Sequence, residues 1–66
     1  MNILVKVDGK NEEIELPSGA TVFDAYKKLN LSTEVYIAKR EKEIIIETES
    51  LNNKDCIELI KVISGG

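Results

Sequence analysis

The chain is short and mildly acidic: its 66 residues are 42% hydrophobic and 32% charged, with a formal net charge of −3. A chain of this length buries only roughly 60% of its unfolded surface, so it holds a single core and a single domain. Nine basic residues scattered among twelve acidic ones leave no basic stripe for phosphates, so we expect no direct nucleic-acid partner.

The opening residues and the cysteine count predict a cytoplasmic protein that binds no cofactor. The start, Met1-Asn2-Ile3-Leu4-Val5-Lys6, lacks the basic leader and small-residue cleavage site of a signal peptide, and no apolar run approaches membrane-spanning length. We therefore expect no membrane contact. With no histidine and a single cysteine, Cys56, the chain lacks an internal disulfide and the usual zinc and iron–sulfur ligand sets.

The first elements predicted are a hairpin. Residues 2–7 are rich in β-branched side chains, with Ile3, Val5 and Val7 on one face of a strand. Asp8-Gly9 supplies the residue types of a tight turn, and residues 13–16 then alternate strictly between charged and apolar. This pattern is typical of two antiparallel strands, each with one face buried.

A helix is predicted after the hairpin, from near Val22 to near Asn30. Thr21 and Asp24 resemble a capping box at its start, and asparagine tolerates the left-handed conformation that ends many helices. Helical spacing places one apolar face on the hairpin, formed by Val22, Ala25 or Tyr26, and Leu29.

Residues 35–38, 44–46 and 56–63 are the remaining strand candidates. A charged reversal without glycine separates the first two, and a turn at residues 52–55 precedes the last, whose inward side chains should be Ile57 and Leu59. The order is ββαβββ or ββαββ. This predicts an α+β fold of the β-grasp, ubiquitin-like type, with a mixed sheet of four to five strands packed on one helix.

We expect residues 1–63 to form this domain and residues 64–66 to follow it as a flexible tail. Ser64, Gly65 and Gly66 have little to bury and great backbone freedom. Two interpretations are open: a frayed end, or a slender segment without Cβ atoms that threads a partner's narrow active site. The Gly66 carboxylate, with a pKa of about 3.5, is an unreactive anion, so acyl chemistry there needs another enzyme to activate it.

The chain resembles the ubiquitin-like sulfur carrier proteins: the thiamine-pathway carrier, the small subunit of molybdopterin synthase and the archaeal small modifier proteins. The resemblance covers essentially the whole sequence and is carried by residues 1–5, 16–22, 51–55 and 58–66. The terminal Gly-Gly is its most specific part, because we expect the carboxylate to be exposed without proteolysis. Residues 40–43, residues 53–55 and Ser64 depart from the patterns common among these relatives, which leaves the subfamily open.

The resemblance implies a co-substrate rather than an enzyme. An E1-like enzyme would adenylate Gly66 with ATP and magnesium, and sulfur from a persulfide donor would replace AMP to give a Gly66 thiocarboxylate. A sulfur-accepting synthase or thiolase in the thiamine, molybdopterin or tRNA thiolation pathway would then take the sulfur. The alternative is a protein modifier joined to lysines through Gly66.

Three apolar side chains are candidates for partner docking. If Ile57 and Leu59 face the helix, then Leu4, Ile60 and Val62 lie on the opposite face of the sheet, beside the tail. They form either a docking patch or ordinary scattered surface residues. Cys56 is expected to pack as a small hydrophobe or to lie half-exposed at the start of the last strand.

Overall fold

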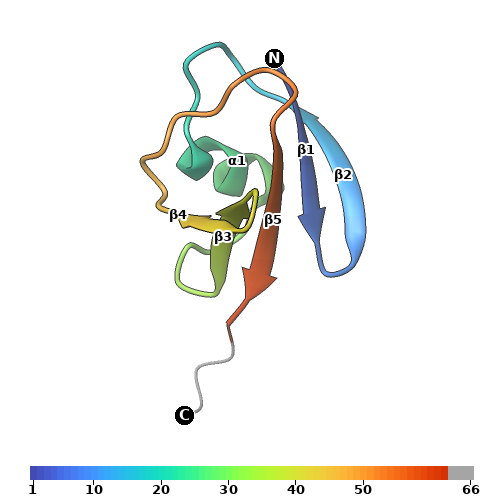
Figure 1. Cartoon of the computed structure of the whole chain (residues 1–66), viewed down its shortest axis with the longest axis vertical. Helices are drawn as coiled ribbons and strands as arrows, with labels where there is room; N and C mark the ends of the chain where they lie inside the picture. The colour runs from blue at the N-terminus through green and yellow to red at the C-terminus, as the bar shows by residue number, and fades with distance from the viewer. Residues whose placement is uncertain (63–66) are drawn as a thin grey trace.

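The computed structural model describes residues 1–62, and the residues predicted to form the tail lie outside this range. Strands β1 (Asn2–Val7) and β2 (Lys10–Glu15) precede helix α1 (Val22–Leu29), and β3 (Tyr36–Arg40), β4 (Glu43–Ile45) and β5 (Cys56–Lys61) follow it. The sheet order is β2-β1-β5-β3-β4 (Figure 1). Strands β1 and β5 are parallel, and the other pairs are antiparallel. The mixed sheet with one helix confirms the predicted β-grasp architecture, with five strands.

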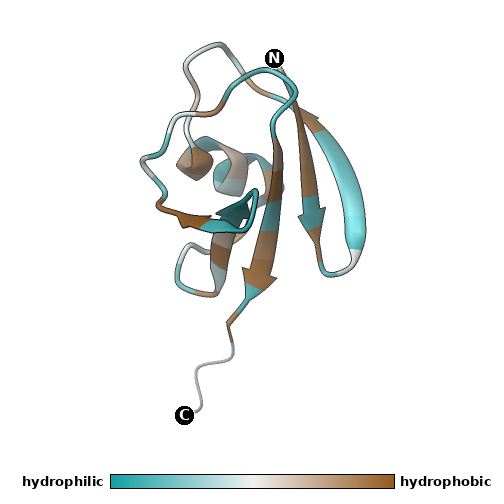
Figure 2. Ribbon diagram, viewed as in Figure 1, coloured by the Kyte–Doolittle hydropathy of each residue, from teal (hydrophilic) through white to brown (hydrophobic). Residues whose placement is uncertain are grey.

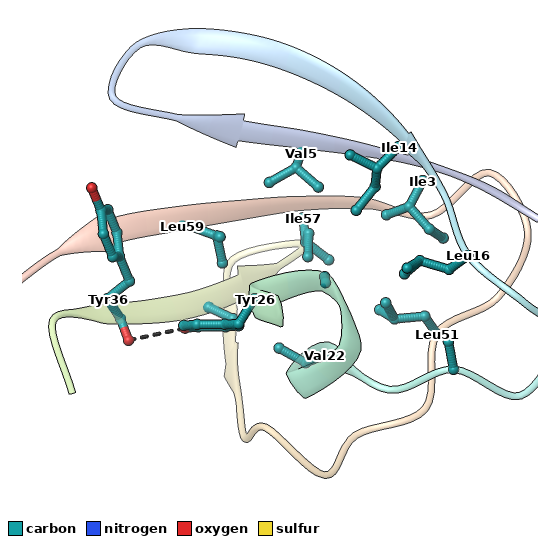
Figure 3. Close-up of a cluster of buried hydrophobic side chains, with 13 residues drawn as sticks. Ile3, Val5, Ile14, Leu16, Val22, Tyr26, Tyr36, Leu51, Ile57 and Leu59 are labelled. Atoms are coloured by element: carbon teal, nitrogen blue, oxygen red, sulfur yellow. Dashed lines mark hydrogen bonds between the residues drawn. The ribbon is translucent and has the colours of Figure 1, made fainter. Parts of the chain in front are cut away.

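The core lies between α1 and one face of the sheet. Its buried side chains come from both strands of the first hairpin, from the helix, from β3 and from β5, with Leu51 adding cover from the long connection (Figure 3). Ile3, Val5 and Ile57 are almost completely buried. On the helix both Ala25 and Tyr26 are buried, which resolves the choice left by the sequence. The full set of buried residues is Ile3, Val5, Ile14, Leu16, Ala20, Val22, Ala25, Tyr26, Tyr36, Ala38, Leu51, Ile57 and Leu59.

Helix α1 begins and ends as its sequence predicts. The Asp24 carboxylate accepts a hydrogen bond from the backbone N–H of Thr21 at 2.8 Å, which is the reciprocal half of a capping box. Asn30 has a φ of 57°, in the left-handed region, and the next N–H, that of Leu31, donates to the Tyr26 carbonyl. Charges follow the helix dipole, because Asp24 lies in the first turn and Lys27 and Lys28 in the last.

The predicted boundaries of four strands needed correction. The second strand is longer than residues 13–16 at its start, because Lys10–Glu15 pairs with β1 along its whole length despite its polar composition. Strand β3 begins one residue later than predicted and runs on through Arg40, while β4 starts at Glu43 and ends one residue early. The last strand ends at Lys61 within the described residues.

The two hairpins use the same kind of tight turn with very different residues. Asp8 and Gly9 have φ values of 51° and 78°, which suit the type I′ turn that favours an Asp-Gly pair. Glu41 and Lys42 have φ values of 52° and 72° at the matching positions between β3 and β4. The charged reversal is therefore a two-residue turn built without glycine or asparagine. Both residues carry a Cβ atom, so the left-handed backbone conformation costs about 1 kcal/mol at each of them.

Replacing Lys42 by glycine should relieve this strain. We expect Lys42→Gly to raise the free energy of unfolding by about 1 kcal/mol, measured by urea denaturation followed by circular dichroism. The matched control is Gly9→Lys in the other hairpin, where a Cβ atom has open space and only the positive φ opposes it. That control should lose about 1 kcal/mol. An unchanged or lowered stability of Lys42→Gly would show that the turn is not strained.

Candidate functional site

Strand β5 is the central strand of the sheet and the last one before the predicted tail. It pairs in parallel with β1, where Val5 lies opposite Ile57, and antiparallel with β3, where Tyr36 lies opposite Lys61. The pairing continues past the strand, because the N–H of Val62 donates to the carbonyl of Val35 at 2.6 Å. The sheet therefore holds the chain firmly up to Val62. The predicted acyl-carrying and threading residues, Ser64, Gly65 and Gly66, lie outside the described residues.

Alternation along β5 divides its side chains between two faces of the sheet. Ile57 and Leu59 are buried against the helix side, as predicted. Cys56, Glu58, Ile60 and Val62 consequently point to the other face, which the helix does not cover. We call this second face the outer face.

Ile60 and Val62 lie in an apolar cluster at the tail-proximal end of the outer face. Ile60 is paired across the strands with Ile37, and both are half-buried, while Val62 is 44% exposed. We define Ile37, Ile60 and Val62 as the outer apolar cluster. Ile37 was not predicted as part of this cluster, because the antiparallel β3–β5 pairing joins segments that are distant in the sequence. Figure 2 shows β5 alternating between hydrophobic and hydrophilic colour, with a hydrophobic stretch just before its hydrophilic tip.

Leu4 shares the outer face but lies at the other end of β5. Its register partner is Cys56, four residues before Ile60, which places Leu4 about 13 Å from the outer apolar cluster. Lys6 and Glu58 are paired in the row between them. The structure thus brings Ile60 and Val62 together and leaves Leu4, 38% exposed, as a separate apolar position.

A charged hollow of about 200 Å³ occupies the middle of the outer face. Three lysines, two glutamates and the exposed Cys56 line it, namely Lys6, Lys39, Lys42, Glu41, Glu58 and Cys56, together with Ile57. Of the two placements expected for Cys56, the structure favours the exposed one at the start of the last strand over packing as a small hydrophobe. The outer face combines an apolar end at Ile60 and Val62 with a centre of mixed charge, so it presents both apolar area and charge to a partner protein.

A hydrogen bond spans the sheet at the tail-proximal end. The hydroxyl of Tyr36 on β3 donates to the Asp8 carboxylate at 3.1 Å, so β3 is tied to the β1–β2 turn across the central strand. Burial and the neighbouring Asp8 carboxylate raise the pKa of Tyr36 above its usual value. Tyr36 stays protonated and available as a donor at neutral pH, which fixes the position of both neighbours of β5.

Within residues 1–62 the chain has no helix of the length and apolar character needed to cross a membrane. The same range gathers no group of three or more side chains of the kinds that ligate metal ions. The site in the described residues therefore consists of a strand end, an apolar cluster and a charged hollow.

Comparison with solved structures defines the class of protein. The chain superposes on SAMP1 from Haloferax volcanii with a TM-score of 0.79 and 20% identity, covering 100% of both chains. The ubiquitin of Caldiarchaeum subterraneum gives a TM-score of 0.77 and 22% identity over 100% of this chain and 98% of that one. ATBAG1, from a complex with HSP70, gives 0.78 and 13% identity. This chain matches it over 92% of its own length but spans only 40% of that protein. The fold is that of a ubiquitin-like protein.

The family is shown by the sequence as a whole. The model of the ThiS family matches residues 1–66, so this chain belongs to the ThiS family. Membership and fold together support a ubiquitin-like sulfur carrier or modifier. Carriers of this family are generally not enzymes themselves, and they work with E1-like activating enzymes and sulfur-accepting partners.

Two matched substitutions test where a partner docks on the outer face. Val62 and Leu4 are similarly exposed apolar residues on that face, at opposite ends of β5. We expect Val62→Asp to weaken binding to the E1-like partner about tenfold, because it puts a charge into the outer apolar cluster. Leu4→Asp should weaken it less. Isothermal titration calorimetry measures both, and equal affinity of Val62→Asp and wild type would place the interface elsewhere.

Proposed function

We propose that this protein is a sulfur carrier whose terminal residue, Gly66, is converted to a thiocarboxylate. The observation that carries the proposal is the match to the ThiS family, which extends through residue 66 and so includes the Gly-Gly end. The β-grasp body supports it, because the central strand β5 leads directly into the last residues of the sequence.

The chemistry requires a partner enzyme. A carboxylate with a pKa of about 3.5 is a stable anion at neutral pH and does not react with nucleophiles. In the proposed cycle an E1-like enzyme uses ATP and magnesium, and an oxygen of the Gly66 carboxylate attacks the α-phosphorus to release pyrophosphate. The terminal sulfur of a persulfide then attacks the acyl carbon and displaces AMP, which gives an acyl disulfide. A thiol reductant cleaves the S–S bond of that intermediate, so that the thiocarboxylate leaves and the thiol ends in a disulfide with the donor sulfur. The product keeps one carboxyl oxygen and gains one sulfur.

The number of residues after Val62 limits the distance between the folded domain and the Gly66 carboxyl group. Val62 is the last described residue, and its N–H is bonded to the sheet. Four residues follow it in the sequence, and four residues span at most about 14 Å. The partner's reactive centre must then lie within that distance of the end of β5. A partner that grips the outer apolar cluster, which includes Val62, places Gly66 within reach of such a centre. The domain serves as the handle and Ser64, Gly65 and Gly66 as the threading segment.

Intact-protein mass spectrometry tests the proposal. After incubation with the E1-like enzyme, ATP, magnesium, a persulfide donor and a thiol reductant, the protein should become heavier by the difference between one sulfur and one oxygen atom. Cys56→Ser is the control, because Cys56 is the chain's only thiol and a persulfide on it would add a whole sulfur atom. The exchange should persist in Cys56→Ser and vanish when Gly66 is deleted. Its absence in the complete reaction would contradict the proposal.

The second candidate function is protein modification, because the same acyl-adenylate reacts with a lysine amine as well as with sulfur. In that case Gly66 would become joined to lysines of target proteins through an amide bond. Denaturing gels of cell extract distinguish the two uses. A ladder of tagged protein that disappears on deletion of Gly66 indicates conjugation, whereas free protein alone favours sulfur transfer.

The proposed sulfur acceptor is a partner enzyme in one of three biosynthetic pathways. The delivered sulfur would enter thiamine, molybdopterin or thiolated tRNA through a sulfur-accepting synthase or thiolase. Genes adjacent to this one, encoding a thiazole synthase, a large molybdopterin synthase subunit or a tRNA thiolation enzyme, would choose among them.

A further inference from the structure

Strand β2 forms one edge of the sheet and presents a regular row of backbone groups to solvent. The Met1 amino group donates to the Leu16 carbonyl at 2.6 Å, and the Leu16 N–H donates to the Met1 carbonyl at 2.8 Å. In an antiparallel ladder such hydrogen-bonded pairs alternate with pairs that do not exchange bonds. Ile14, Glu12 and Lys10 therefore bond to β1.

The alternate residues of β2 are Asn11, Glu13 and Glu15, and their N–H and C=O groups point away from the sheet. The same alternation on β1 agrees, because the Leu4 N–H donates toward β5, to the carbonyl of Asp55. No backbone partner for these three residues occurs within residues 1–62. The outward N–H and C=O groups of these three alternate residues can form main-chain hydrogen bonds with an added strand.

A hollow of about 270 Å³ lies beneath this edge, between β2 and the C-terminal end of α1. Its floor is apolar, formed by the half-buried side chains of Val7, Leu29 and Leu31. Asp8 of the β1–β2 turn and Lys10 and Glu12 of β2 supply the polar part of its lining. Alternate side chains of a strand added to β2 point to the helix side of the sheet, where this hollow can take an apolar residue.

The charge of the edge selects the partner. Glu12, Glu13 and Glu15 are all exposed, and β2 carries Lys10 as its one cation. The ion pairs in the described residues involve Arg40 only, so none of these three carboxylates is neutralised there. Figure 2 shows β2 coloured as hydrophilic over most of its length. An added strand with Lys or Arg at the positions beside Glu13 and Glu15 complements this charge.

The opposite edge offers no comparable row. Strand β4 has only three residues. They pair with Ala38, Lys39 and Arg40 of β3, so Tyr36 and Ile37 are the residues of β3 that have no partner in β4. The Tyr36 N–H donates to the Ser32 carbonyl, and the Tyr36 carbonyl accepts the buried hydroxyl of Tyr26 at 2.9 Å. The backbone that β4 leaves uncovered is thus already bonded, and β2 is the longer open edge of the described sheet.

We propose that the β2 edge binds an extended segment of a partner protein as a sixth strand. The segment carries basic side chains at the positions facing Glu13 and Glu15 and an apolar side chain over the hollow beneath Glu12. This surface is distinct from the outer apolar cluster and from Gly66, so the segment can bind while the chain's end is engaged elsewhere. The proposal goes beyond sulfur transfer and does not depend on it.

The first experiment uses a synthetic peptide of alternating lysine and valine, capped at both ends, with the ¹⁵N-labelled full chain. The amides of Asn11, Glu13 and Glu15 should gain protection from hydrogen exchange when the peptide binds. Those of Glu12 and Ile14, already bonded to β1, should change little. A peptide of the same sequence N-methylated on alternate amides keeps the charge but loses the donors, and should bind about tenfold more weakly.

The second experiment changes the edge itself. Glu13→Pro removes an outward-facing N–H and leaves the bonds to β1 intact, a position where proline is tolerated in a sheet. We expect it to fold and to weaken peptide binding about tenfold. The double variant Glu13→Gln, Glu15→Gln keeps the backbone, and should reduce both the affinity and its salt dependence.

Several outcomes would overturn the proposal. One is that the lysine–valine peptide does not bind, which would leave the glutamates as protection against edge-to-edge aggregation. Others are exchange protection that maps to another surface, or equal binding of the N-methylated peptide, which would mean that charge alone attracts it. If Glu13→Pro fails to fold, the N-methylated peptide and the glutamine variant still decide the matter.

Discussion

The parallel pairing of β1 with β5 is the constraint on which the rest of the molecule depends. It sets Val5 beside Ile57 and Val7 beside Leu59, so the buried side chains of both strands meet the same side of α1. Because side chains alternate, a shift of one residue would turn Ile57 and Leu59 to the outer face. The same register fixes the direction of β5, and hence the end of the sheet from which the last residues of the chain continue.

Because β5 is the central strand, the two surfaces proposed to bind partner proteins lie apart on the sheet. Its outer face carries the apolar cluster of Ile37, Ile60 and Val62 at the C-terminal end of β5, and the hollow lined by lysines and glutamates lies nearer the middle of the strand. The β2 edge lies beyond β1, on the other side of β5 from β3. A carrier that must bind an activating enzyme and then an acceptor gains from such separation, since one contact need not break before another forms.

Local signals in the sequence predicted the elements well, and the long-range arrangement was beyond them. The limits of the first strand and of α1 followed from β-branched alternation, from Thr21 and Asp24 at the helix start and from Asn30 at its end. The first half of β2 was missed because Lys10, Asn11 and Glu12 have polar side chains and are held by backbone pairing alone. Ile37 was missed as a neighbour of Ile60 because strand order is a property of the whole chain. The prediction of a tail at residues 64–66 rested on composition and on the family resemblance, and these residues lie outside the described structure.

The turn at Glu41 and Lys42 shows how tertiary context overrides a local preference. A type I′ turn prefers Asn-Gly or Asp-Gly, and the first hairpin follows that rule at Asp8 and Gly9. In the second hairpin the β3–β4 register places Arg40 opposite Glu43 and leaves two residues to reverse the chain. Arg40 is anchored there by its guanidinium, which donates to Glu49 at 2.8 Å and to Asp55 at 3.1 Å. These contacts tie the hairpin to the connection that leads into β5, so the strained turn holds Lys42 at the hollow on the outer face.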